Sequence, residues 1–131
     1  MQGPGRLIAI SSVLGKFGVA GYSAYCASKT GILGLVRATA LELGPRKITC
    51  NAICPGWVET EMARSGILEI SAVTGDTPED FKKKACEAFP LGRFVEPEEV
   101  ARLVVFLSSA GGDAITGQAL SICGGATTFA G

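Results

Sequence analysis

Residues 7–29 read LIAISSVLGKFGVAGYSAYCASK and combine a short apolar run, two serines, a glycine-spaced loop and the start of a helical pattern. The run Leu7–Ile10 is continuously apolar and short, which is typical of a strand buried on both faces of a parallel sheet. After the loop, Tyr25 and Lys29 stand four residues apart, so on a helix they lie on one face, one turn apart. The stretch therefore predicts a strand, a loop and a helix.

The pattern following this stretch completes a repeat of strand, helix and strand. The helical pattern continues from about Tyr22 to Leu43, where a Gly-Pro pair ends it, and small residues are dense along it, which favours close packing against another element. Residues 48–54, ITCNAIC, predict a second strand ended by Pro55 and Gly56. Strands joined by a helix are parallel, so Ser12 and the Pro55-Gly56 loop are expected to be neighbours at the carboxyl edge of the sheet, where such sheets bind ligands.

The middle of the chain, from about residue 60 to 90, has a mixed pattern. Two short helices are predicted near 61–70 and 78–89, with Gly66, Gly75 and Pro78 as interruptions. A long irregular insertion at the ligand edge of a sheet is typical of a mobile lid over a pocket.

The last third of the chain repeats the alternation of helix and strand. Pro97, followed by two glutamates, begins a helix that reaches about Leu107. Residues 118–123, QALSIC, precede two glycines and predict a third strand. The sequence as a whole predicts an α/β fold with three parallel strands and crossover helices.

Composition excludes several classes of site. The 131 residues are 47% hydrophobic, enough for a core, and carry twelve basic and twelve acidic groups, so we expect no nucleic-acid or anionic-membrane surface. The chain has no histidine, which excludes a serine–histidine triad and an imidazole metal site, and we expect no metal.

Cysteine usage and hydropathy predict the compartment. The five cysteines are an odd number without a Cys-x-x-Cys pair, so a disulfide framework is not expected. No apolar run approaches a membrane span, and the first residues lack the layout of a signal peptide. These features predict a soluble cytoplasmic protein.

Ser12, Tyr25 and Lys29 form the candidate catalytic group. A phenol is a poor acid or base at neutral pH, but an ammonium group one turn away favours the phenolate. A serine hydroxyl at the end of the neighbouring strand then holds a carbonyl or alcohol oxygen. Such a site moves a proton to or from a substrate oxygen, and the matching hydride needs a cofactor.

This arrangement resembles the short-chain dehydrogenase/reductase family. Ser12 is followed thirteen residues later by Tyr25, which begins a Tyr-x-x-x-Lys motif. Further motifs occur in the family's order, at Gly5–Ile8, Asn51-Ala52, Pro55–Thr60, Pro90–Arg93, Pro97–Ala101, Ile115–Gln118 and Gly124-Gly125. The resemblance covers essentially the whole chain and implies the C-terminal half of a Rossmann-like doubly wound parallel sheet, a single partial domain over residues 1–131.

The resemblance also implies a role for individual residues. Tyr25 would be the general acid in carbonyl reduction, Ser12 would orient the carbonyl, and Lys29 would favour the phenolate and hold the nicotinamide ribose of NAD or NADP. The remaining cofactor contacts that it implies are Pro55, Gly56, Val58 and Thr60. Within the family the sequence is most similar to β-ketoacyl reductases, polyketide ketoreductases and cyclic-alcohol dehydrogenases, with candidate pocket walls at Leu14, Tyr22, Trp57, Met62 and Leu91.

Each of these assignments has a structural alternative. An aromatic residue beneath a surface lysine on an ordinary helix, without a catalytic role, would show the same pattern as Tyr25 and Lys29. Ser11 and Ser12 are both candidates for a helix cap or turn, and we assign Ser11 that structural role. Pro55 and Gly56 also suit a plain turn at the end of a strand.

The chain lacks the family's front half, which carries the glycine-rich turn and the residues around the adenosine ribose. Two hypotheses follow. In the first, the chain is the catalytic half of an NAD(P)-dependent oxidoreductase that interconverts a small-molecule ketone and a secondary alcohol. In the second, it is a short product that folds by oligomerising or by pairing with another polypeptide, without turnover or cofactor binding of its own. A dimer or tetramer of identical chains is expected.

Overall fold

The computed structural model describes residues 4–128, which form a parallel three-stranded sheet with helices on both faces. The strands are β1 (Gly5–Ile10), β2 (Ile48–Pro55) and β3 (Ala119–Ile122). The α-helices among the described residues are α1 (Ser23–Leu43), α2 (Glu61–Thr74), α3 (Pro78–Ala88) and α4 (Pro97–Ser108). Single 3₁₀ turns are η1 (Val13–Gly15), η2 (Gly44–Arg46) and η3 (Ala110–Gly112). The predicted α/β class and the order of the elements are confirmed.

The sheet has the order β1-β2-β3, so β2 is central and β1 is an edge strand of the sheet within the described residues. β1 pairs with β2 from Gly5 opposite Ile48 to Ile10 opposite Ile53. Residues 48–54 of β2 are all buried, as expected for a central strand of a parallel sheet. Both strands are parallel, so their carboxyl ends meet at one edge.

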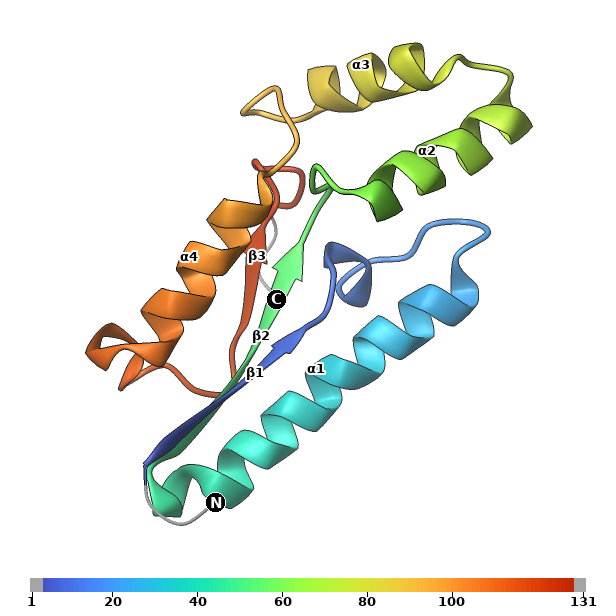
Figure 1. The fold of residues 1–131 in the computed structure, drawn as a ribbon. Coiled ribbons are helices and arrows are strands. Elements are labelled where there is room, and N and C mark those ends of the chain that lie inside the picture. The colour runs from blue at the N-terminus through green and yellow to red at the C-terminus, as the bar shows by residue number, and fades with distance from the viewer. Residues whose placement is uncertain (1–3, 129–131) are drawn as a thin grey trace.

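Helices α1 and α4 cover opposite faces of the sheet (Figure 1). α1 buries Leu33, Val36 and Ala40 against the β2 side chains that face it, which are Cys50, Ala52 and Cys54. α4 packs on the other face and buries Leu107. The core therefore lies in two apolar layers with the sheet between them, which is the layering of α/β proteins.

The outer surface of α1 differs from the prediction of close packing around its small residues. A Cβ atom added at Gly31 or Gly34 would meet no atom within 4 Å. Leu35 and Leu41 on the same helix are 65% and 82% exposed. The described residues therefore provide no partner for this helix surface.

Local sequence signals place the ends of α2 and α4. Thr60 caps α2 through a hydrogen bond accepted from Ala63 N–H, and Gly75 ends it with a φ of 81°. α4 begins with Pro97 and a capping box in which the Glu99 side chain accepts from Glu96 N–H.

The predicted interruption of the first lid helix at Gly66 is wrong, because α2 continues through it to Thr74. A glycine inside a helix costs only about 1 kcal/mol relative to alanine. The buried residues Ala63, Ile67 and Ser71 hold one face of α2 across this position. The segment predicted as an irregular insertion is therefore mostly helical, and α2 and α3 extend beyond the carboxyl edge of the sheet (Figure 1).

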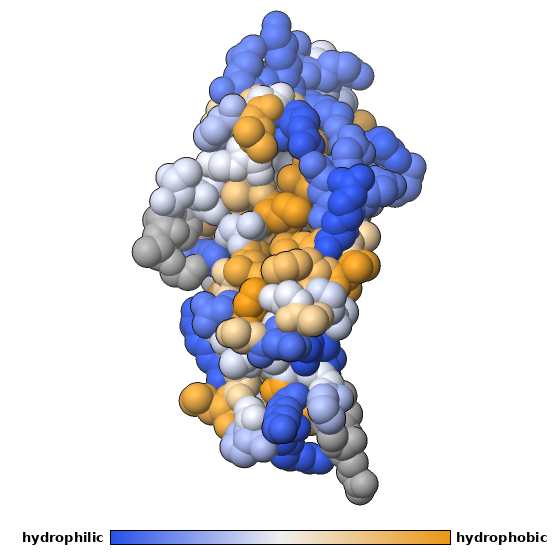
Figure 2. Space-filling model, turned by 90° about the vertical axis from the view of Figure 1, so that its left-hand side faces the viewer, coloured by the Kyte–Doolittle hydropathy of each residue, from blue (hydrophilic) through white to orange (hydrophobic). Residues whose placement is uncertain are grey.

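The molecular surface is divided between polar and apolar regions. Figure 2 shows hydrophilic side chains over the α3 end of one face and hydrophobic side chains gathered across its middle. Val105 and Phe106 of α4 are among the exposed large hydrophobic residues.

All five cysteines are free thiols, which confirms that the fold has no disulfide framework. Within residues 4–128, no helix has both the length and the hydropathy that crossing a membrane requires.

Candidate active site

The serine pair lies where β1 leaves the sheet at its carboxyl edge. Ser11 N–H still donates to the carbonyl of Ile53 on β2, with an N–O distance of 2.8 Å. Ser12 is buried and caps η1, because its Oγ accepts a hydrogen bond of 3.1 Å from Leu14 N–H. This contact uses the Ser12 oxygen as an acceptor and leaves the hydroxyl proton for another partner.

Tyr25 and Lys29 lie in the first two turns of α1, as their spacing predicted. The Tyr25 side chain is 40% exposed, and the Tyr22 ring stands edge-on to it at 6.3 Å between ring centroids. The Lys29 ammonium lies 5.6 Å from the centre of the Tyr25 ring and donates a 3.3 Å hydrogen bond to the carbonyl of Ile10. The last residue of β1 therefore holds the lysine beside the tyrosine.

Ser11 also reaches α1, which sequence reasoning missed. Its Oγ donates a 2.8 Å hydrogen bond to the carbonyl of Lys29. Ser11 is structural, as expected, but through this bridge to α1 and not as a cap, because the cap of η1 is Ser12. Sequence offers little signal for this contact, since the two partners are eighteen residues apart and either serine suits a cap.

The loop after β2 lies close to the end of β3. Gly56 N–H donates to the carbonyl of Ile122 at 3.0 Å. A Cβ atom at Gly56 would lie 2.9 Å from Cys123 Cβ, so only glycine fits this approach. Pro55 is the last residue of β2, and Val58 forms an isolated bridge with Val95. The predicted cofactor loop is thus held by backbone contacts at the carboxyl edge.

Thr60 is occupied by contacts within the fold. Its Oγ1 accepts from Ala63 N–H at 3.1 Å and donates to the carbonyl of Val58 at 3.3 Å. The implied contact between Thr60 and a cofactor would therefore replace, or share, one of these two hydrogen bonds.

The predicted pocket walls are not gathered in one place. Trp57 stacks on Phe94 with ring centroids 5.5 Å apart and meets Phe81 edge-on at 6.1 Å. Met62, by contrast, is 79% exposed on α2. Tyr22 lies against Tyr25. Leu14 is in η1, which begins directly after Ser12. These two therefore adjoin the catalytic candidates.

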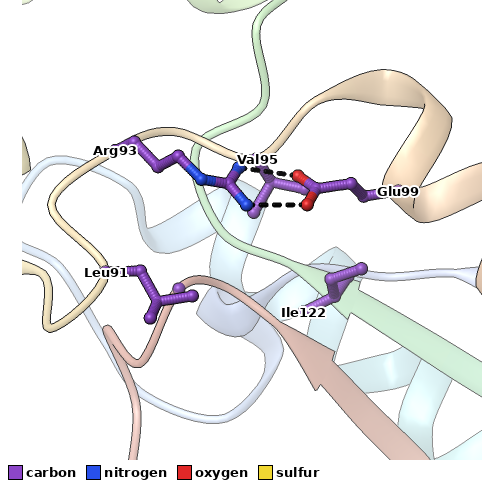
Figure 3. A pocket seen from close by; sticks show the side chains of 6 residues that line it. Leu91, Arg93, Val95, Glu99 and Ile122 are labelled. Carbon is purple, nitrogen blue, oxygen red and sulfur yellow. Dashed lines mark hydrogen bonds and ion pairs between the residues drawn. The ribbon is translucent and has the colours of Figure 1, made fainter.

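Leu91 lines a separate small cavity of about 70 Å³ whose walls are Leu91, Arg93, Val95, Glu99, Ile122 and Gly124 (Figure 3). Arg93 and Glu99 form a two-bonded ion pair there, at 2.8 and 2.7 Å. The Arg93 hydrogen bonds, with the Glu96 N–H, lower the pKa of Glu99 from 4.5 to about 2. Ser12, Tyr25 and Lys29 do not line this cavity, so Leu91 lies apart from the three catalytic candidates.

The buried thiols of β2 and of the turn after β3 have different environments. Burial raises the pKa of Cys50 and of Cys54 above the ordinary value for a thiol. Burial also acts to raise the pKa of Cys123, but hydrogen bonds from Thr127 and from the backbone of Gly125 and Ala126 outweigh it, and the net shift is downward. The turn after β3 therefore presents N–H groups toward the end of the strand.

A parallel sheet with helices on both faces, and with polar residues gathered at its carboxyl edge, belongs to the doubly wound α/β class. A family model described as "Enoyl-(Acyl carrier protein) reductase" matches residues 1–127. The chain belongs to the short-chain dehydrogenase/reductase family.

Similar proteins are named as reductases and dehydrogenases. The chain is 40% identical to the 3-oxoacyl-(acyl-carrier-protein) reductase of Thermotoga maritima, over 95% of this chain and 46% of that protein. It is 39% identical to the (3R)-3-hydroxyacyl-CoA dehydrogenase of Mus musculus, over 94% of this chain and 43% of that protein. The chain thus spans about half the length of the curated relatives it matches.

A crystal structure of an actinorhodin polyketide ketoreductase variant with NADPH has a closely similar fold. The TM-score is 0.91 at 42% identity, over 96% of this chain and 48% of that chain. The likeness extends over nearly all of the described fold, including the carboxyl edge of the sheet.

Proposed function

We propose that this chain is the proton-handling half of an NAD(P)-dependent reductase that interconverts a ketone and a secondary alcohol, with Ser12, Tyr25 and Lys29 as its catalytic residues. One observation carries the proposal. The Lys29 ammonium is anchored to the end of β1 at 3.3 Å and lies 5.6 Å from the Tyr25 ring, while Ser12 follows on the same strand end.

The three side chains divide the work on the substrate oxygen. The Ser12 hydroxyl donates a hydrogen bond to the carbonyl oxygen and orients it. Tyr25 gives its phenolic proton to that oxygen as negative charge develops on it, and the Lys29 ammonium stabilises the phenolate that remains. In the reverse direction the phenolate takes the proton back from the alcohol. A bound reduced nicotinamide supplies the hydride.

The donors of this site suit a nicotinamide ribose. Tyr25 is partly exposed, and its hydroxyl together with the ammonium of Lys29 provides the hydrogen-bond donors that a ribose diol accepts. The structural relative with NADPH supports this cofactor class. Pro55, Gly56, Val58 and Thr60 would complete the contacts, mainly through backbone groups, since the Thr60 hydroxyl already caps α2.

The relatives' names support a 3-oxoacyl group as the ketone substrate. Leu14 and Tyr22 adjoin the catalytic residues and would contact the carbons next to the ketone. Helices α2 and α3 extend beyond the same edge of the sheet and would cover the longer part of the substrate (Figure 1).

The second hypothesis, a chain without turnover of its own, also has a supporting observation. β1 is an edge strand, with Ile10 46% exposed at its carboxyl end, and an apolar edge of a parallel sheet favours association. A dinucleotide site needs both halves of a doubly wound sheet. We therefore expect the isolated chain to associate with itself and to show no tight NADPH binding, which cofactor fluorescence and sedimentation measure.

The activity is tested in a hybrid in which this chain replaces the matched half of the Thermotoga maritima reductase. We expect the hybrid to oxidise NADPH in the presence of a 3-oxoacyl thioester. Tyr25→Phe removes only the hydroxyl and is expected to lower the rate at least a hundredfold. Ser28→Ala also removes one hydroxyl from the same helix, but this hydroxyl bonds to the Tyr25 carbonyl within α1, so the change should leave the rate within a few-fold of the parent.

Two results of this experiment would contradict the proposal. One is a hybrid that keeps its rate with Tyr25→Phe. The other is a hybrid that folds and binds NADPH but does not reduce the ketone of the 3-oxoacyl thioester. Circular dichroism and NADPH fluorescence establish folding and binding in each variant before the rates are compared.

A further inference from the structure

Two consecutive residues at the end of β1, Ile10 and Ser11, form hydrogen bonds with Lys29. One bond is to its side chain and the other to its backbone. The carbonyl of Ile10 accepts a hydrogen bond from the Lys29 ammonium at 3.3 Å. The hydroxyl of the next residue, Ser11, donates to the carbonyl of Lys29 at 2.8 Å. The residue after that is Ser12. The strand end therefore holds both the backbone and the side chain of the lysine and places the catalytic serine directly beside them.

A second pair of contacts lies one residue further along α1. Thr30 Oγ1 donates to the carbonyl of Gly15 at 3.1 Å. Gly15 itself is tightly packed, because a Cβ atom there would lie 2.8 Å from Ser11 Oγ and 2.9 Å from the Lys29 carbonyl. Glycine at this position thus allows the segment from Ser11 to η1 to approach α1 closely. The hydroxyls of Ser11 and Thr30 can then form their hydrogen bonds between the two.

The connection between η1 and α1 is less closely packed than these contacts. Residues 17–21 are all exposed, and a Cβ atom at Gly18 or Gly21 would meet nothing within 4 Å. The exposed residues of this loop fix the position of α1 less closely than the packing around Gly15 does. The side-chain hydrogen bonds of Ser11 and Thr30 are directional and add a defined distance between β1 and α1.

We propose that Ser11 and Thr30 are positioning residues that fix Lys29, and with it Tyr25, relative to Ser12. The proposal rests on the proposed function, because the position matters for catalysis only if these three residues carry the reaction. Ser11 is 3% exposed, so its hydroxyl has no solvent to bond to if the Lys29 carbonyl moves away. Burial therefore favours this bond over an unpaired hydroxyl, and the Cys54 thiol also hydrogen-bonds with Ser11.

The first test uses the 131-residue chain and needs no turnover. The readouts are the NMR signal of the Lys29 side chain and the amide exchange of residues 23–33. Ser11→Ala is expected to shift the Lys29 signal and to speed exchange in this segment about tenfold, the loss of about one hydrogen bond. Thr30→Val should speed exchange there a few-fold, and Thr30→Ser, which keeps the hydroxyl, should restore the parent rate.

Ser28→Ala is the matched control, because the Ser28 hydroxyl bonds to the Tyr25 carbonyl within α1 and does not bridge to β1. It should leave the Lys29 signal in place. An unchanged Lys29 signal in a folded Ser11→Ala chain would overturn the proposal. If Ser11→Ala does not fold, the two Thr30 variants provide the test instead. Equal amide exchange in Thr30→Val and Thr30→Ser would then overturn the proposal.

The second test measures kinetics in the hybrid reductase. Ser11→Ala should lower kcat about ten- to a hundredfold, the range expected for a small misplacement of catalytic groups, with the KM for the thioester nearly unchanged. Thr30→Val should lower kcat less, and Thr30→Ser should restore it. Unchanged kcat in Ser11→Ala overturns the positioning role. A hybrid that retains its rate with Tyr25→Phe refutes the proposed function instead, and the Lys29 signal in the isolated chain would still report the bridge.

Discussion

The junction between β1 and α1 and the arm formed by α2 and α3 are held in different ways. At the junction, side-chain hydrogen bonds from Ser11, Lys29 and Thr30 join the strand end to the helix. The arm depends on an aromatic cluster of Trp57, Phe81, Phe89 and Phe94 and on an ion pair of Lys82 with Glu59.

The difference follows from what each region has to do in the proposed reaction. Hydrogen bonds depend on distance and angle, so they fix atoms that must keep one arrangement. Ring contacts and ion pairs between exposed or partly exposed side chains allow small sliding motions, which suits helices that would cover a substrate. Regions with few buried contacts open more readily than the core. We therefore expect faster amide exchange in α2 and α3 than in the first turns of α1.

The largest expected effect is that of Trp57→Ala on the arm. It removes the ring that stacks on Phe94 and meets Phe81, at a cost of about 3 kcal/mol in the free energy of unfolding. Amide exchange should rise in α2 and α3 much more than in α1. Trp57→Phe keeps a stacked ring and should recover most of the loss. An equal rise in α1 would show that the two regions open together.

Gly15→Ala tests the junction and is expected to cost about 2 kcal/mol, the usual effect of overpacking. The new methyl group would meet Ser11 Oγ and the Lys29 carbonyl within 3 Å, and should disturb α1 exchange while sparing the arm. Gly18→Ala is the control, because its Cβ meets nothing within 4 Å and the change should stay within about 0.5 kcal/mol. Denaturant unfolding compares them, and equal costs would contradict the tight approach at Gly15.

The Arg93–Glu99 pair lies outside the junction and gives a pH-dependent comparison. The pKa of Glu99 falls from 4.5 to about 2 on folding, so its stabilising effect is present above 4.5 and is lost as pH falls toward 2. Above pH 4.5, the melting temperature of Glu99→Gln should be lower than that of the parent. The difference between the two melting temperatures should shrink as the pH falls from 4.5 toward 2. A gap that persists at the acid end would contradict this account of the ion pair.

The smallest effect is expected for Lys82→Met, which removes the arm's ion pair with Glu59 and the contact of the ammonium with the Phe94 ring at 5.0 Å. Because this lysine is partly exposed, the loss should be about 0.5 kcal/mol. It should appear as faster exchange in α3 alone. Lys83→Met, on the exposed side of the same helix, is the control and should have less effect on both stability and exchange.

The sequence by itself determined the order of the elements and the composition of the candidate site. A continuous apolar run marked β1, and a Pro-Gly pair marked the end of β2. The four-residue spacing of Tyr25 and Lys29 placed them on one helix face. These features depend on contacts between near neighbours in the chain, for which periodicity and turn residues are direct signals.

The tertiary structure alone decided which serine bridges to α1, how α2 continues through Gly66, and where Leu91 lies. Ser11 and Ser12 are the same residue type in adjacent positions, and only the path of the loop shows that Ser11 faces the Lys29 carbonyl while Ser12 caps η1. Leu91 lies beside β3 because of how the loop before α4 folds back. Such contacts join segments distant in the chain, and their geometry depends on the packing of the whole fold.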